Sequence, residues 1–186
     1  GVRLAQPKLK MMGIETAKSS TPQWVRGKLT DAFNVVMNGT EQDLWKFVEE
    51  ARRDFRTLPP EEVAFPRGCR GLKQYADRTM IYSKGTPIHV RGALLYNKLL
   101  VDKNLDMRYE VIKDGEQLHF SYLTTPNPIN ENVISFTGGL PKEFDLHRFV
   151  DHDMQFDKAF VEPLKAVIGL IGWNPEPVAS LDSFFA

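Results

Sequence analysis

The feature that most constrains the fold is a pair of helical patterns that meet at Asn38-Gly39-Thr40. Apolar residues recur three or four apart before this turn, from residue 22 to 38, and again after it, from residue 41 to 55. Such spacing places the apolar side chains on one face of each helix. Asn38-Gly39 stops the first helix and Thr40 caps the second, so the sequence predicts an antiparallel helical pair. The apolar stripes are Val25, Leu29, Phe33 and Val36, then Leu44, Phe47, Val48, Ala51 and Phe55.

Helix boundaries are predicted from prolines and caps. We expect Thr21 to cap the first helix with Pro22 as its first residue, and Pro87 to open a third helix. The third helix carries an apolar set, and a last helix over 154–171 is expected to kink at Pro163. This set is Val90, Ala93, Leu94 and Val101, and the third helix also carries Asn97.

Short strands and turns complete the pattern. Asp114-Gly115 predicts a two-residue hairpin between residues 109–113 and 116–122. Residues 133–136 fit a further short strand or a turn, residues 6–16 an N-terminal strand, and residues 72–76 a short helix. The prediction is an α+β fold that is mainly helical.

Charge is segregated along a chain that is neutral overall, with 24 Lys and Arg against 24 Asp and Glu. Residues 1–28 and 67–103 carry net charges of +5 and +6, whereas residues 29–66 and 104–186 carry −4 and −7. Such a chain can present a basic face, although ordinary solvated surface explains the same numbers. The single cysteine, Cys69, fits a reducing compartment, and no apolar run or leader pattern indicates a membrane or secretion.

One basic segment, residues 8–22, offers ammonium groups, hydroxyls and backbone N–H groups together, which is how phosphate backbones are gripped. Its lysines are Lys8, Lys10 and Lys18, around Met11, Met12 and Ile14, and it ends in Ser19, Ser20 and Thr21.

This segment resembles the one that leaves the palm and enters the thumb in family B DNA polymerases, especially those of T-even-like bacteriophages. There, Lys-x-Lys-x-x-Gly-x-Glu is followed by Lys-Ser-Ser-Thr-Pro. The resemblance implies a mainly helical thumb subdomain with a small antiparallel β element and an N-terminal strand that belongs to the palm. It implies that residues 1–20 end the palm, residues 21–172 form the thumb, and residues 173–186 form a linker and a clamp-binding tail.

A second basic patch lies at the start of the third helix, where backbone N–H groups and the helix dipole favour a phosphate. Its residues are Lys84, His89, Arg91 and Lys98. Lys-x-x-Pro-x-His-x-Arg-Gly recurs in the thumb of the phage enzymes, so the resemblance implies phosphate contacts for Lys84 and Arg91. A capped amphipathic helix with surface cations is the alternative.

The last helix also resembles a thumb helix. Lys158 matches a position that contacts DNA in the family, and Glu162 departs from it because relatives commonly have lysine there. A cluster that precedes this helix does not have metal-ligand spacing, so we expect it to complement the helix dipole instead of binding a metal. The cluster is His147, Asp151, His152 and Asp153.

The C-terminus, with Leu181, Phe184 and Phe185, resembles the sliding-clamp-binding peptide of replication proteins. One helical turn brings these three side chains together. The usual glutamine is replaced by Val178, so the match is partial. A hydrophobic tail that folds back on its own core is the alternative.

The resemblance implies the C-terminal thumb part of a replicative DNA-directed DNA polymerase, cut from a longer protein. It would grip primer–template duplex DNA and tether the enzyme to its sliding clamp in the cytoplasm of an infected bacterium. The other partners would be the palm, fingers and exonuclease domains. We expect no catalytic residue and no cofactor in this chain, and no activity from it alone, because the palm carboxylates that bind Mg²⁺ are missing.

A different class of function fits the same residues. The chain could be a stand-alone, non-catalytic adaptor protein that recruits a partner through Leu-x-x-Phe-Phe and binds no DNA. Palm motifs encoded in frame before Gly1 would discriminate between the two interpretations.

Overall fold

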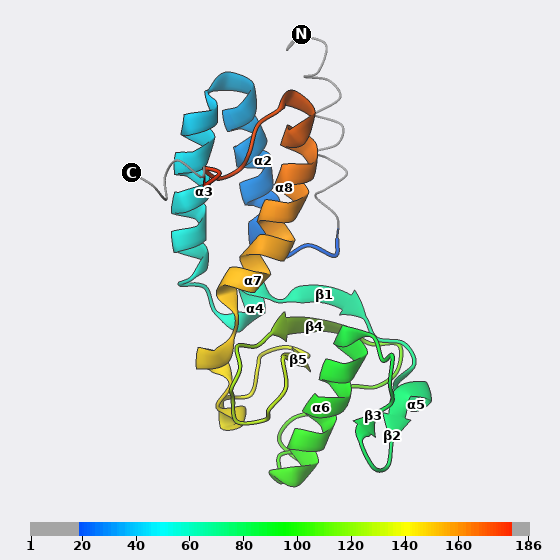
Figure 1. Cartoon of the computed structure of the whole chain (residues 1–186). Helices are drawn as coiled ribbons and strands as arrows, with labels where there is room; N and C mark the ends of the chain where they lie inside the picture. Colours follow the sequence, from blue (N-terminus) through cyan, green and yellow to red (C-terminus); the bar gives the residue numbers. More distant parts are fainter. Residues whose placement is uncertain (1–18, 180–186) are drawn as a thin grey trace. The chain divides into compact units, whose positions relative to one another are not determined.

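The computed structural model describes residues 19–179 and divides the chain into two compact units (Figure 1). Of the described residues, 19–57 and 156–179 belong to unit 1, and 58–155 belong to unit 2. The predicted strand over residues 6–16 lies outside the described residues. Each unit is described below by itself.

Unit 1 begins with the predicted helical pair, α2 (Gln23–Asn38) and α3 (Glu41–Phe55). Thr40 forms a capping box: its hydroxyl accepts from the backbone N–H of Asp43, and the Asp43 carboxylate accepts from the N–H of Thr40. Both the turn at Asn38-Gly39 and the cap at Thr40 are confirmed. The start of α2 was predicted wrongly, because Pro22 itself takes the N-cap position and cannot offer a side-chain acceptor.

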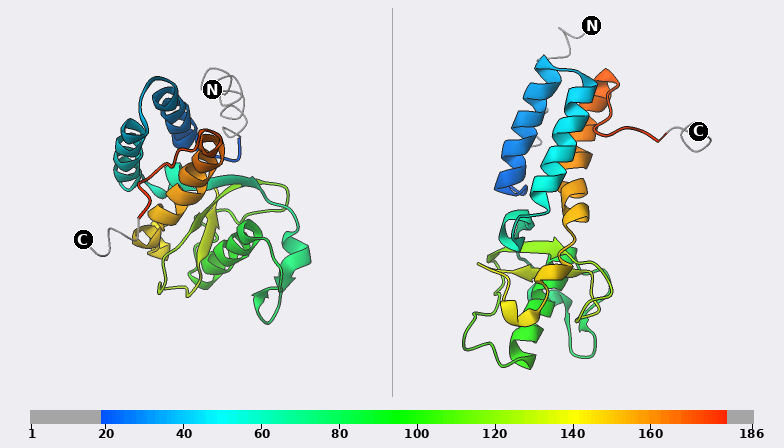
Figure 2. Two further views of the ribbon diagram at one scale, coloured as in Figure 1. Left: turned by 45° about the horizontal axis from the view of Figure 1, so that its top comes forward. Right: turned by 90° about the vertical axis from the view of Figure 1, so that its left-hand side faces the viewer.

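The last helical run of unit 1 has three parts: a π-helical turn over Asp157–Val161, α8 (Glu162–Ile168) and a 3₁₀ turn over Gly169–Ile171. Pro163 lies in the first turn of α8, directly after the π-helical turn, where its missing N–H is tolerated. This run and the pair α2/α3 lie alongside one another in Figure 2.

Aromatic rings fill the centre of unit 1. The ring centroid of Phe55 lies 5.5 Å from that of Trp24 and 5.3 Å from that of Phe156. The ring centroids of Phe156 and Phe160 lie 4.8 Å apart. Phe55, Phe156 and Phe160 are fully buried. Phe33 and Phe47, expected on the buried stripes, are only half-buried, and Ala32 takes the inner position on α2.

Unit 2 is built on a three-stranded antiparallel sheet in the order β1-β4-β5. Its strands are β1 (Phe65–Gly68), β4 (Gln117–Tyr122) and β5 (Val133–Phe136), and β5 is buried at every residue. The other strands and helices of the unit are short. They are α4 (Pro60–Val63), α5 (Leu72–Tyr75), the two-stranded ribbon β2 (Ala76–Asp77) and β3 (Ile81–Tyr82), two 3₁₀ turns (Lys142–Phe144 and His147–Phe149), and α7 (His152–Phe156), which leads into unit 1.

The predicted hairpin at Asp114-Gly115 was wrong in its pairing. The strand β4 pairs with β1 and β5, and residues 109–113 form no strand. The side chain of Asn97 holds Ile112 instead: it accepts from the N–H of Ile112 at 2.7 Å and donates to its carbonyl at 2.9 Å. A side chain from a helix thus takes the backbone groups that a hairpin partner would need.

The helix α6 (Ile88–Asp102) packs on β5. The contact is close at Gly92, where a Cβ atom would lie 2.3 Å from Ser135 Oγ and 2.7 Å from Ser135 N. Pro87 precedes the helix as predicted, but the buried face includes Leu95, Tyr96 and Leu100, whereas Val101 is 58% exposed. The predicted stripe was therefore right at Val90 and Ala93, which are buried, and wrong at Val101.

A buried glutamine joins distant parts of unit 2. Gln155 is fully buried; its amide donates to the carbonyl of Val63 at 2.8 Å and its oxygen accepts from the N–H of Tyr122 at 2.9 Å. The described part of the chain is thus a mixed α+β structure, as predicted. No helix among residues 19–179 is long and apolar enough to cross a membrane.

Candidate nucleic-acid interface

The start of α6 carries the best-defined group of predicted phosphate contacts. The first turn of the helix contains no acidic residue, and Pro87 at the N-cap makes no side-chain hydrogen bond. Lys84 is exposed in the turn that leads into the helix. Gly85 has φ +83° in this turn, and the hydroxyl of Thr86 donates to the carbonyl of Ser83. The ordered turn therefore places the exposed Lys84 just before the positive end of a 15-residue helix.

Arg91 lies one turn into α6, where its backbone N–H donates to the carbonyl of Pro87 at 2.9 Å. The centre of its guanidinium lies 5.5 Å from the centroid of the Tyr82 ring, and Nη2 donates to Oδ1 of Asn132. The hydroxyl of Tyr82 donates to the carboxylate of Glu131, at 2.9 and 3.1 Å from its two oxygens. Sequence analysis singled out Arg91 but none of the residues around it.

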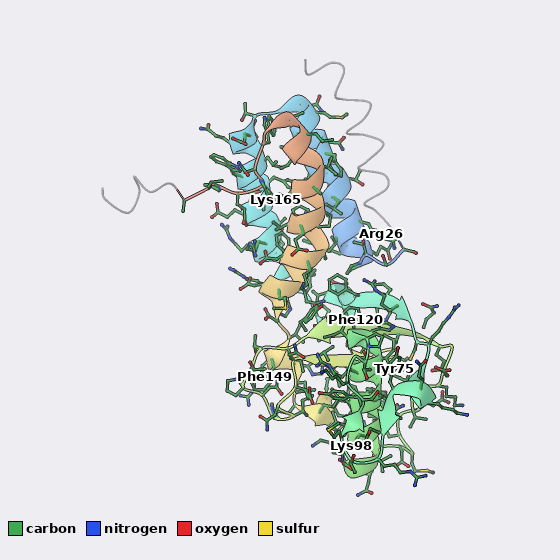
Figure 3. The ribbon with its side chains drawn as sticks, turned by 45° about the vertical axis from the view of Figure 1, so that its right-hand side comes forward. Arg26, Tyr75, Lys98, Phe120, Phe149 and Lys165 are labelled. Carbon is green, nitrogen blue, oxygen red and sulfur yellow. The ribbon has the colours of Figure 1, made fainter. Side chains whose placement is uncertain are left out.

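His89 belongs to the same turn but faces the sheet. Its ring centroid lies 6.2 Å from that of Phe120, which Figure 3 labels, and its carbonyl accepts from the hydroxyl of Ser135 at 2.8 Å. Burial, and then the positive charge of Arg67, lower the pKa of His89 below its usual value, against a hydrogen bond with the backbone of Gly68. With a pKa below 6.5, His89 is mostly neutral at pH 7 and adds little positive charge to this surface.

Arg67 is a cation beside His89 that sequence analysis missed. Its guanidinium lies 5.6 Å from the centroid of Phe65 and 5.4 Å from that of Phe120, and burial lowers its pKa. Phe65 and Arg67 are two positions apart on β1 and so project from the same face of the strand. That spacing was the available signal, but only the pairing of β1 with β4 brings Phe120 beneath the guanidinium.

Lys98 was expected in the same patch, and this expectation was wrong. It lies toward the C-terminal end of α6 (Figure 3) and pairs with Asp102 one turn later. Ten residues separate Lys98 from Ile88 at the start of the helix, which corresponds to about 15 Å along its axis.

The remaining predicted DNA contacts belong to unit 1. Ser19 is exposed and Ser20 half-buried in the turn before α2, and Lys158 is exposed in the π-helical turn. Glu162 is exposed at the start of α8. Six of the predicted site residues lie outside the described residues. They are the DNA contacts Lys8, Lys10 and Lys18, and the clamp-binding Leu181, Phe184 and Phe185.

The histidine and aspartate cluster before the last helix makes structural hydrogen bonds. The carboxylate of Asp151 accepts from the N–H of Met154 at 3.0 Å, which caps α7. The ring nitrogens of His152 lie 3.1 Å from the carbonyl oxygen of Val150 and 2.9 Å from that of Leu58. Within residues 19–179 no group of three or more His, Cys, Asp and Glu side chains could hold a metal ion.

The segment after α8 is bound to α3. Gly172, with φ +76°, ends the helical run, and the N–H of Trp173 donates to the carbonyl of Ile168. Both backbone groups of Asn174 are then bonded to side chains of α3: its N–H donates to Glu41 and its carbonyl accepts from Trp45, each at 2.8 Å. These residues were predicted to be a linker, because no sequence pattern near them indicates that they form hydrogen bonds with α3.

Comparison with known proteins extends over the whole chain. It is 30% identical over 187 residues to the DNA-directed DNA polymerase of Enterobacteria phage T4, an alignment that covers 98% of this chain and 20% of that protein. It is also 30% identical over 190 residues to the DNA-directed DNA polymerase of Escherichia phage RB69, which covers all of this chain and 20% of that protein. No protein-family model matches the chain.

The chain spans about a fifth of the length of these relatives. Because the similarity extends from one end of the chain to the other, it includes both units and every segment in which the sequence resembled the thumb. The resemblance to the family B DNA polymerases of phages is therefore confirmed, as a similarity of this whole chain to one fifth of a DNA-directed DNA polymerase.

Proposed function

We propose that this chain is the thumb portion, with the last palm strand, of a phage-type family B DNA polymerase, and that it holds primer–template duplex DNA through backbone phosphates. The observation that supports this most strongly is the similarity to two phage polymerases along the whole chain. The residues we assign to phosphate contacts are Lys8, Lys10, Lys18, Ser19, Ser20, Lys84, Arg91 and Lys158.

The geometry of α6 supports this role in unit 2. Lys84 is exposed, and Arg91 keeps its charge beside a helix start that contains no acidic residue in its first turn. His89 is assigned a different part: as a neutral ring against Phe120, it supports the helix start and does not neutralise a phosphate. These contacts would fix the register of the duplex without reading its sequence.

A titration with labelled primer–template DNA tests this proposal. Fluorescence anisotropy across a salt series should show weak binding without sequence preference and a log–log salt slope of about −3 to −5, as expected for four to six phosphate contacts. If the chain fails to bind even at low salt, the adaptor protein that binds no DNA becomes the better interpretation.

We further propose that the chain has no polymerase activity by itself and that its C-terminal peptide tethers the enzyme to a sliding clamp. The carboxylates that hold Mg²⁺ would come from the palm of the complete enzyme, and none of the residues discussed here has that task. Primer extension with the purified chain, Mg²⁺ and deoxynucleotides should give no product. Template-directed synthesis by a pure preparation would contradict this assignment.

A further inference from the structure

We propose that Tyr82 and Asn132 are positioning residues for Arg91, and that Glu131 acts through Tyr82. Together they hold the guanidinium at the start of α6 in the orientation in which it meets a DNA phosphate. This inference rests on the proposed function of unit 2 in binding DNA, and it assigns roles to three residues that do not themselves contact the DNA.

Three separate segments meet at the guanidinium. Tyr82 comes from β3, Arg91 from α6, and Glu131 and Asn132 from the loop before β5. The Tyr82 ring lies on one side of the guanidinium, and Asn132 accepts a hydrogen bond from Nη2. The Nε atom of Arg91 is buried and has no hydrogen-bond partner among the described residues. The side chain is thus restrained along its length, with little rotamer freedom left to lose when it binds.

Tyr82 is itself held in place. Its hydroxyl donates to both oxygens of Glu131, and burial, followed by this hydrogen bond, raises its pKa. The group therefore stays a phenol and a donor at neutral pH. Loss of the Glu131 carboxylate would free the ring that lies against Arg91, so Glu131 can affect the guanidinium without touching it.

The partners of Arg91 position it without neutralising it. Both are uncharged, a phenol ring and an amide oxygen, and no carboxylate of a described residue lies within ion-pair distance of the guanidinium. Arg52 in unit 1 shows the opposite arrangement, since its guanidinium lies 2.7 Å from two carboxylates. Arg91 therefore keeps its full charge for a phosphate, and its order is established before DNA binds.

Removal of a positioning residue and removal of a phosphate contact have different signatures. Loss of Arg91 removes one released counterion and lowers the salt slope by about one unit. Loss of Tyr82 or Asn132 leaves the charge in place, so the affinity should fall while the slope stays the same. We expect a loss of about two- to tenfold, the range for ordering one long side chain on binding.

The test uses the full chain and two measurements. Fluorescence anisotropy with duplex primer–template DNA is recorded across a salt series for Arg91→Ala, Tyr82→Leu, Asn132→Ala, Glu131→Ala and Glu131→Gln. In the absence of DNA, ¹⁵N relaxation of the Arg91 Nε–H group reports the order of the guanidinium. Tyr109→Phe is the matched control, because it removes another phenol-to-carboxylate hydrogen bond, 2.8 Å to Glu143, at a distance from Arg91 in sequence.

We expect Tyr82→Leu, Asn132→Ala and Glu131→Ala to weaken binding at an unchanged salt slope and to mobilise Arg91. Glu131→Gln keeps an acceptor for the phenol, so the DNA affinity and the order of Arg91 should match those of the unmodified chain. Tyr109→Phe should change neither the affinity nor the order of Arg91. The inference is overturned if Arg91 stays equally ordered in these variants, or if Tyr82→Leu lowers the slope by a full unit, which would make Tyr82 a contact residue.

Failure of the proposed function is distinguishable from failure of this inference. If the unmodified chain binds no DNA at low salt, the DNA role of unit 2 is wrong, and with it the purpose assigned to the restraint. The relaxation measurement needs no DNA. If Arg91 becomes mobile in Tyr82→Leu, this result would still establish that Tyr82 restrains the guanidinium.

Discussion

The guanidinium of Arg52 lies 2.7 Å from the carboxylate of Glu176, and this ion pair joins the last turn of α3 to the segment that follows the last helix. The same nitrogen lies 2.7 Å from Asp157, and the guanidinium lies 4.7 Å from the ring centroid of Phe156. One side chain thus holds two parts of unit 1 that are more than a hundred positions away in sequence. The C-terminal segment is packed on the unit through residue 176, well beyond the end of α8.

Arg52→Ala should release this segment. Because the Arg52 side chain is only 18% exposed but its carboxylate partners are about half exposed, we expect a loss of about 1–2 kcal/mol in the free energy of unfolding. Hydrogen exchange at the amide of Asn174 should accelerate at the same time. The control is Arg53→Ala, whose exposed pair with Glu49 at 3.4 Å should contribute less than about 0.5 kcal/mol. Equal effects of both substitutions would show that Arg52 is not the residue that holds the segment.

Gly92→Ala should destabilise unit 2 by about 3 kcal/mol, because a Cβ atom at 2.3 Å from Ser135 Oγ and 2.7 Å from Ser135 N forces α6 away from β5. Gly27→Ala is the matched control in α2. A Cβ atom there meets nothing within 4 Å, so the better helix propensity of alanine should stabilise the chain by about 0.5–1 kcal/mol. Thermal and denaturant unfolding measure both effects, and a neutral Gly92→Ala variant would contradict the close contact.

Two histidines of unit 2 should make its stability depend on pH. Burial lowers the pKa values of His89 and His119 below 6.5, so between those values and 6.5 the unfolded chain binds more protons than the folded chain. Stability should therefore rise with pH in this window and fall as the pH drops from about 7 toward 5.

Unfolding at pH 7.5, 6.5 and 5.5 checks the direction of this dependence. His89→Gln and His119→Gln should each flatten the curve, provided that the variant is folded at pH 7.5. Protonation of His89 would also add charge at the start of α6, so DNA affinity should rise toward low pH where the chain stays folded. A stability that increases on acidification through this range is incompatible with histidines whose pKa values are lowered by partial burial.

Lys84→Ala and Arg91→Ala should each weaken duplex binding for all sequences alike and flatten the salt slope by about one unit. Thermal stability should change by less than about 1 kcal/mol for Lys84→Ala, as is usual for surface cations. Arg91→Ala also loses the contacts of the guanidinium with Tyr82 and Asn132, so its effect on stability should be larger. Lys98→Ala, on the same helix but paired with Asp102, is the matched control and should leave the slope unchanged. A large loss of stability with an unaltered slope would assign Lys84 and Arg91 a structural role.

Truncation after Val178 should leave the fold and the DNA affinity intact and abolish binding to the cognate clamp. Residues up to Glu176 hold the bonds to α3, whereas Val178 is 69% exposed. Each aromatic anchor of such a peptide typically contributes about 2 kcal/mol or more at a hot spot, so Phe184→Ala and Phe185→Ala should each weaken the interaction. Calorimetry of the clamp against these chains provides the measurement, with an expected affinity on the order of micromolar. Clamp binding that survives the truncation would rule out this tail as the tether.

The sequence by itself determined the features that depend on neighbouring residues. The turn at Asn38-Gly39, the cap at Thr40 and the helix after Pro87 were predicted correctly, because each needs only residues within about four positions. The α+β class and the resemblance to phage polymerases were likewise legible. Of the site residues, Lys84 and Arg91 lie where the sequence placed them, at the start of α6.

Only the tertiary structure decided the features that depend on distant partners. The helix α6 is apolar on several sides, so more than one stripe fits its sequence, and packing on β5 selects the one that is buried. The strand β4 pairs with β1 and β5, and Asn97 binds Ile112, where a hairpin partner was expected. The neutrality of His89, the partners of Arg91 and the attachment of Asn174 to α3 all arise between segments far apart in the chain, where burial and hydrogen-bond geometry leave no local signature in the sequence.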